Sequence, residues 1–104
     1  MNAYRIQYWL YAVINRNFGQ HVKIERDAQH RRYDVNRHGM HLRSTQFSAQ
    51  AMEKVLAEVL VAAGYEHTKD GFTKKIGKKR PVIHITQETG HGGARSLYIF
   101  LMVY

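Results

Sequence analysis

The sequence predicts an α+β fold in which two helices pack on one face of a mainly antiparallel sheet. Apolar residues recur at helical spacing in two segments, residues 3–17 and 46–63. Segments in which apolar and polar residues alternate follow each of these helices, as expected of half-buried strands. The order helix, hairpin, helix, hairpin plus strand suggests a duplicated αββ unit, although the two halves share little sequence. At 104 residues, the chain is expected to form one domain, residues 1–104.

The first segment, residues 3–17, is predicted to be an amphipathic helix. Read as a strand, it would place Arg5 and Gln7 on the same side as Trp9, whereas a helical wheel separates apolar from polar side chains. The predicted apolar face is Ile6, Trp9, Leu10, Val13 and Ile14, and the predicted polar face is Arg5, Gln7, Tyr8, Asn15 and Arg16. Any tyrosine of this segment that lies on the outer face is a candidate for a protein interface.

A hairpin is predicted to follow the first helix. Residues 21–27 alternate, with Val22 and Ile24 on one side, and a second alternating piece contains Tyr33 and Val35. Gly39 is expected to break the second strand, which then resumes after a bulge or turn.

The second helix, residues 46–63, has the clearest pattern in the chain. Its apolar residues repeat at helical spacing, and Ser44, Thr45 and Ser48 are candidate caps at its start. Gly64 stands where a helix commonly ends in a left-handed residue.

The rest of the chain is predicted to form a meander of strands. The Asp70-Gly71 pair favours a tight turn between residues 65–68 and 72–76, and residues 82–85 form the next strand. The last segment, Leu97–Tyr104, is almost wholly apolar. Two alternatives remain for it: a central strand buried on both faces, or an edge strand closed by another chain, which would make a homodimer.

Composition points to a polyanionic partner. Sixteen Lys and Arg stand against eight Asp and Glu, a formal net charge of +8, and this excess favours binding to DNA or RNA by counterion release. A highly charged, well-solvated surface is the plainer explanation. The absence of cysteine excludes disulfides and thiolate metal sites. Without a membrane-spanning apolar run or a signal-peptide pattern, a cytoplasmic protein without membrane association is the expectation.

The positive charge gathers in three places. Residues 69–80 predict a hairpin with a lysine-rich tip. Two roles are open for this tip: it contacts a phosphate backbone, or it only protects an exposed strand edge. Residues 23–43 are rich in arginine but also contain acids that can pair with it. Residues 90–93 form a glycine-rich loop next to Arg95, more typical of a plain turn than of an anion site. The predicted nucleic-acid-binding residues are Arg31, Arg32, Arg37, Lys69, Lys74, Lys75, Lys78, Lys79, Arg80 and Arg95.

Aromatic residues near these charges are candidates for stacking on unpaired bases. Tyr33, Tyr65 and Phe72 lie close to basic residues in the sequence. Burial in the core or at the rim of the sheet is the favoured alternative for all three, since aromatic side chains are ordinarily buried.

Seven histidines raise the question of catalysis. No pair has the helical i, i+4 spacing of a zinc protease, and no catalytic residues, metal or cofactor are assigned. His84 and His91 are nevertheless candidates for acid–base cleavage of RNA. If residues 82–86 form a strand, His84 faces away from Ile83 and Ile85.

Three functional hypotheses follow from these patterns. The first is a small basic nucleic-acid-binding protein, with DNA and RNA both open. The second is a protein-interaction module, an adaptor or inhibitor that docks on an acidic protein surface, of the small basic kind common in phage and mobile-element genomes. The third is a histidine-dependent ribonuclease. A non-enzymatic role is favoured because no spacing singles out a reaction.

Overall fold

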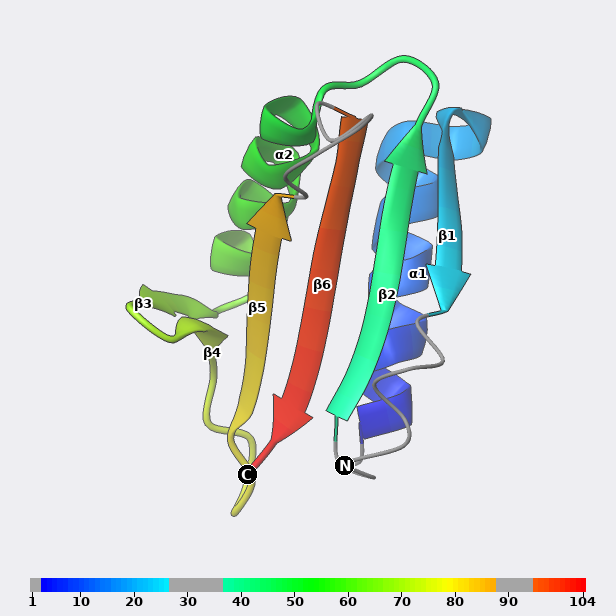
Figure 1. Ribbon diagram of the computed structural model, residues 1–104. Coiled ribbons are helices and arrows are strands. Elements are labelled where there is room, and N and C mark those ends of the chain that lie inside the picture. The colour runs from blue at the N-terminus through cyan, green and yellow to red at the C-terminus, as the bar shows by residue number, and fades with distance from the viewer. Residues whose placement is uncertain (1–2, 27–36, 88–94) are drawn as a thin grey trace.

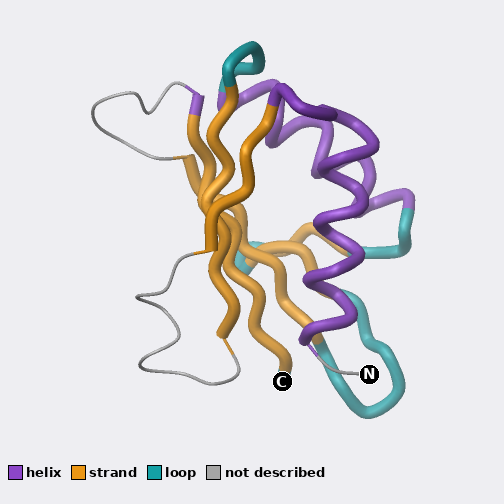
Figure 2. Tube along the Cα trace, turned by 90° about the vertical axis from the view of Figure 1, so that its right-hand side faces the viewer, coloured by secondary structure: helices purple, strands orange, loops and turns teal. Residues whose placement is uncertain are grey.

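The structure is a computed structural model that describes residues 3–26, 37–87 and 95–104, and it has two layers (Figure 1). One layer is a six-stranded antiparallel sheet with the order β1-β2-β6-β5-β4-β3. The other is a pair of helices, which Figure 2 shows on one side of the sheet. The elements are α1 (Ala3–Phe18), the 3-10 turn η1 (Gly19–His21), β1 (Val22–Arg26), β2 (Arg37–Ser44), α2 (Ala49–Ala62), β3 (Glu66–Thr68), β4 (Gly71–Thr73), β5 (Pro81–Gln87) and β6 (Ser96–Val103). The predicted α+β class is confirmed.

Helix α1 packs the predicted apolar stripe against the sheet. Leu10 and Ile14 are fully buried, and Ile6 and Val13 nearly so. The prediction for Gln7 was wrong, because its side chain is 2% exposed rather than on the polar face. Residue 7 lies three positions before Leu10 and seven before Ile14, so it belongs to the same buried stripe. The Gln7 Oε1 has no hydrogen-bond partner among the described residues.

Helix α2 begins three residues later than predicted because two serines cap two separate turns. The Ser44 Oγ accepts hydrogen bonds from the amides of Gln46 and Phe47, at 3.0 and 2.6 Å, and so closes a separate turn before the helix. The Ser48 Oγ then accepts from the Ala51 amide at 3.1 Å and is the N-cap. At the other end the φ angle of +95° at Gly64 confirms the predicted terminator.

Strands β1 and β2 form an antiparallel hairpin without the predicted break. Gly39 lies inside β2 and is in register with Phe100 of β6, so strand pairing continues through it. A glycine weakens a strand because it has no side chain to pack and loses more backbone entropy on folding, but pairing with β6 holds this one in place. Residues 27–36, with the predicted strand piece around Tyr33 and Val35, lie outside the described residues.

The segment predicted as one basic hairpin, residues 69–80, contains two turns at opposite ends of β4. Lys69 and Asp70 form the first, between β3 and β4, where the Thr68 Oγ1 accepts from the Asp70 amide at 3.2 Å. The second lies between β4 and β5, where Ile76 and Lys79 bridge. Strand β4 ends at Thr73 rather than at residue 76.

Strand β6 lies at the centre of the sheet and pairs along its length with β2 on one side and β5 on the other. The edge-strand alternative was therefore wrong, and strand pairing with a second chain would have to displace one of these neighbours. Leu97, Ile99 and Leu101 are fully buried under the helices. The opposite side of β6 is only half-buried, so the strand is not buried equally on both faces.

The topology agrees with two helix–hairpin units. The hairpin β1–β2 follows α1, and the strands β5 and β6 follow α2, with β3 and β4 added between. Strands β2 and β6 are the inner strands of the two units, and they pair antiparallel. A two-fold axis between them, perpendicular to the sheet, relates two units in this way. This arrangement leaves one sheet face turned away from both helices, which we call the outer face (Figure 2).

Candidate nucleic-acid interface

The strand register sets the side chains of the outer face in rows across the sheet. One row joins Glu25, His41, Tyr98 and Thr86 on β1, β2, β6 and β5. The next joins Gly39, Phe100 and His84 on β2, β6 and β5. Lys23, Arg43 and Ser96 form a row at one end of the sheet, and Met102 and Val82 pair near the other. Because alternate residues of a strand face the same side, these rows lie on the outer face, and the row through Met102 and Val82 continues onto Thr73 of β4.

Three rings at the centre of this face lie nearly parallel. The rings of His41 and Tyr98 stack across the β2–β6 pair with centroids 4.4 Å apart and planes 10° apart. The rings of Tyr98 and Phe100, two residues apart on β6, have centroids 6.0 Å apart and planes 7° apart. Gly39 adds no side chain to the row beside Phe100. The centre of the outer face is therefore aromatic rather than basic.

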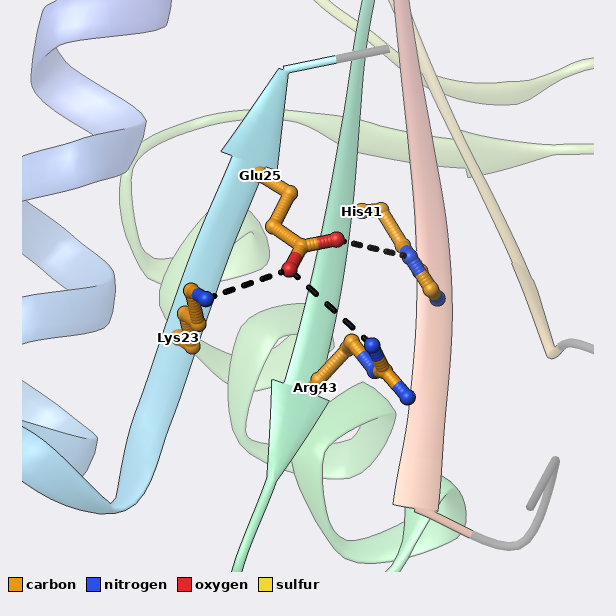
Figure 3. A network of polar contacts seen from close by, with 4 residues as sticks. All are labelled: Lys23, Glu25, His41 and Arg43. Carbon is orange, nitrogen blue, oxygen red and sulfur yellow. Dashed lines mark ion pairs between the residues drawn. The ribbon is translucent and has the colours of Figure 1, made fainter.

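A carboxylate surrounded by three cationic or titratable groups borders the rings (Figure 3). The Glu25 carboxylate lies 3.5 Å from the Lys23 Nζ, 3.7 Å from the His41 Nδ1 and 4.0 Å from an Arg43 guanidinium nitrogen. We call these four residues the Glu25 cluster. The side chains of Lys23 and Arg43 are 76% and 62% exposed, so solvent screens both contacts and they add little stability. This is the pairing of acids with arginines that the sequence indicated for residues 23–43.

Beside the rings, toward the opposite end of the sheet, the outer face has a hollow of about 600 Å³. Phe100 and Met102 of β6 and Val82 and His84 of β5 line it, together with Asp70, Arg80 and Tyr104. The backbones of Arg80 and Tyr104 exchange two hydrogen bonds, of 2.7 and 3.1 Å, which hold both residues at the rim. The hollow thus combines apolar walls with one cation, one carboxylate and one imidazole.

Four exposed cations form what we call the basic turn, between β4 and β5: Lys75, Lys78, Lys79 and Arg80. Among the described residues, no carboxylate lies within ion-pair distance of any of the four. The turn adjoins the end of the sheet where β5 begins, whereas Lys23 and Arg43 lie at the end where β2 finishes. The two groups of cations are therefore separated by the aromatic centre and do not merge into one basic surface.

Two predicted binding residues make structural contacts. The Lys74 Nζ donates a 2.7 Å hydrogen bond to the Ala63 carbonyl at the end of α2 and lies 5.8 Å from the centre of the Tyr65 ring. A guanidinium nitrogen of Arg95 donates a 2.6 Å hydrogen bond to the Thr45 carbonyl. Both cations therefore secure loops around the sheet, in addition to any contact with a ligand.

The remaining predicted binding residues are placed as follows. Lys69 is exposed at the β3–β4 turn, apart from the basic turn. Arg37 begins β2, and its side chain is not among those described. Arg31, Arg32 and the glycine-rich loop at 90–93 lie outside the described residues.

Two of the three aromatic candidates suggested by the sequence are buried and are not at this surface. Tyr65 and Phe72 are 7% and 4% exposed, and Tyr65 stacks on Trp9 with ring centroids 6.0 Å apart. Tyr33 is outside the described residues. Sequence reasoning instead missed Tyr98 and Phe100. The alternation within residues 97–102 was the available signal. Aliphatic residues occupy the odd-numbered positions and Tyr, Phe and Met the even-numbered ones, so the two sets face opposite sides of the strand.

The histidines do not form a metal site within the described part of the chain. No group of three or more metal-ligating side chains occurs among residues 3–26, 37–87 and 95–104. His84 points away from Ile83 and Ile85, as predicted, and is exposed beside Phe100. His91, the other catalytic candidate, is outside the described residues. Neither described helix is long and apolar enough to cross a membrane.

No protein-family model, curated protein sequence or solved structure matches the chain. The chemistry and placement of the chain's own residues are therefore what bears on its function.

Proposed function

We propose that this protein binds nucleic acid and that its cations contact the phosphate backbone. The basic turn is the observation that supports this most directly. Four exposed cations occur within six residues, with no described carboxylate in ion-pair distance, so counterions and not acids neutralise them. Phosphates that replace these counterions release them to solvent, which favours binding.

The backbone of the turn makes it a fixed support for these charges. The amide and carbonyl of Ile76 exchange hydrogen bonds of 2.9 and 3.0 Å with the carbonyl and amide of Lys79. Lys78 lies at the tip between them, and Arg80 is tied to Tyr104 on the neighbouring strand. Cations that are already held close together lose less conformational freedom when they bind a ligand, which favours affinity.

The test is a titration of labelled DNA and RNA at several salt concentrations, with a charge-matched pair of variants. Lys78→Glu combined with Lys79→Glu reverses two charges in the basic turn. Arg16→Glu combined with Lys54→Glu reverses two exposed charges on the helices and changes the net charge equally. We expect the first variant to bind more weakly. The plot of log K against log salt should also become shallower, with the magnitude of its negative slope reduced by about two, because each lost phosphate contact removes about 0.9.

The control variant is expected to keep the slope of the original protein. Equal weakening by the two variants would mean that net charge alone attracts the ligand. No binding at low salt, or binding that does not depend on salt, would contradict the proposed function.

A second candidate, a protein-interaction module, is supported by the outer side of α1. Tyr4 and Tyr8 are 54% and 61% exposed and lie one helical turn apart. Beside them, Arg5, Trp9 and Lys74 help to line a hollow of about 410 Å³ on the helix side of the molecule. Tyrosine, tryptophan and arginine are the residues most enriched at binding hot spots. A stoichiometric complex with an acidic protein that is lost in Tyr4→Ser/Tyr8→Ser, but not in Lys78→Glu/Lys79→Glu, would support this candidate instead.

A further inference from the structure

We infer that the outer face binds single-stranded nucleic acid, with unpaired bases stacked on Tyr98 and Phe100 of β6. This inference rests on the proposed function and names its substrate class. It assigns base recognition to the sheet and leaves the basic turn to contact phosphates.

The arrangement of the rings favours stacking on bases. The planes of His41, Tyr98 and Phe100 differ by no more than 10° between neighbours, and the Tyr98 and Phe100 centroids lie 6.0 Å apart along one strand. Because the His41 ring already covers one face of Tyr98, bases stack on the side of the Tyr98 and Phe100 rings that faces away from His41. Successive bases of an extended single strand can occupy such surfaces one at a time, as on other nucleic-acid-binding sheets. Paired bases cannot, because a duplex already stacks both faces of each base.

Cations lie on both sides of the rings along β6. Lys23 and Arg43 lie at one end of β6, where Arg43 pairs in register with Ser96, and Arg80 lies at the other end, beside Tyr104. From Tyr98 to Tyr104 the strand advances about 20 Å at 3.3 Å per residue. A strand laid along β6 therefore meets a cation before and after its stacked bases. This length suits a site on the order of four nucleotides.

The hollow next to Phe100 can hold one nucleotide. At about 600 Å³ it lies within the size range of small-ligand pockets. Phe100 and Met102 supply an apolar floor, His84 and Asp70 can exchange hydrogen bonds with a base edge, and Arg80 can contact a phosphate. One nucleotide that follows the base on Tyr98 therefore has both a place and polar partners.

Charge distinguishes this occupant from a second copy of the chain. Two copies each carry a formal net charge of +8 and therefore repel each other overall, whereas a phosphate backbone is attracted. Stacking on an aromatic ring also does not depend on base identity, so we expect little sequence preference.

The experiment compares a labelled single-stranded oligonucleotide of ten nucleotides, in DNA and RNA form, with a duplex of the same length. Fluorescence anisotropy gives the dissociation constants of the original protein and of Tyr98→Leu, Phe100→Leu and a control, Tyr8→Leu. Leucine keeps an apolar side chain of comparable length on the half-buried outer face, so the sheet keeps its packing. Melting temperatures verify that each variant is folded.

We expect the original protein to prefer the single strand, and each β6 variant to weaken that binding by about five- to 150-fold. The same variants should leave duplex binding and the salt slope unchanged, because no charge is removed. Tyr8→Leu should bind as the original protein does.

Each other outcome identifies what has failed. Salt-dependent binding that does not distinguish single strand from duplex, and that the β6 variants leave unchanged, overturns this inference and keeps the proposed function. Absence of nucleic-acid binding at low salt overturns both. A single-strand preference that folded β6 variants leave unchanged also overturns the inference. If a β6 variant does not fold, a lack of preference for the single strand in the original protein still overturns it.

Discussion

Replacing Gly71 with alanine is expected to destabilise the protein through a backbone collision between β4 and β5. The φ angle of Gly71 is +127°, a conformation that residues with a side chain rarely adopt. A Cβ at this position would lie 2.6 Å from the Ile83 carbonyl oxygen and 3.1 Å from its carbon. Both are backbone atoms of a paired central region of the sheet, so neither can rotate away. The strained conformation costs about 1–3 kcal/mol, and overpacking adds about 1–3 kcal/mol.

Gly77→Ala is the matched control, because Gly77 also has a positive φ, +60°, but nothing lies within 4 Å of its Cβ position. Its cost is limited to about 1–2 kcal/mol for the left-handed conformation, partly offset by about 0.4–1 kcal/mol from a less flexible unfolded chain. Urea denaturation and calorimetry measure both variants. The unfolded-chain offset applies equally to Gly71→Ala, so central net costs are about 3 kcal/mol for Gly71→Ala and about 1 kcal/mol for Gly77→Ala. At about 4–8 °C per kcal/mol, these costs lower the melting temperature by about 12–24 °C and about 4–8 °C. Equal shifts would refute the collision as the cause.

Three further outcomes are expected. Burial raises the pKa of the Tyr65 hydroxyl above its usual value of 10.0, so the stability that its neutral form provides is complete below pH 10 and is lost as pH rises through the folded-state pKa. Unfolding measured between pH 8 and 11 should show this loss, and Tyr65→Phe should reduce it. Glu25→Gln should change the melting temperature little but strengthen nucleic-acid binding and steepen its salt slope, because two cations are freed. A slope equal to that of the original protein would contradict this. Lys74→Met should cost about 1 kcal/mol in urea unfolding, since the Ala63 carbonyl loses its partner, whereas Lys74→Arg should cost less.

Local patterns predicted the helices and most strands, because each such signal lies within a few residues. The apolar repeat of α1, the serine caps of α2 and the Asp70-Gly71 turn all gave the right element. The prediction that Gln7 lies on the polar face failed because the boundary of a buried helix stripe depends on the width of the surface that covers it. The predicted strand break at Gly39 was wrong because pairing with Phe100 of β6, about sixty residues away in sequence, holds the strand together.

The candidate site was harder to predict because it depends on the lateral order of the strands. Neighbouring lysines in residues 69–80 resembled one basic tip, yet β4 divides them between two turns, and Lys74 turns toward α2. The apolar composition of residues 97–104 concealed a strand with one buried and one half-buried side. Only the register places His41 beside Tyr98 and His84 beside Phe100.

The central position of β6 has a consequence for how the chain folds during synthesis. It is the last described strand in the sequence, yet it alone joins the β1–β2 hairpin to the β5–β4–β3 group. Until residues 96–103 have been synthesised, the edges of β2 and β5 that pair with β6 have no partner. The apolar helix-facing sides of the two groups also lack the buried side chains of β6. Any state in which the two groups have formed without β6 has exposed strand edges and is prone to aggregation. The sheet closes only when β6 pairs with β2 as well as with β5, and the β2–β6 pairs join residues more than fifty positions apart, which slows folding.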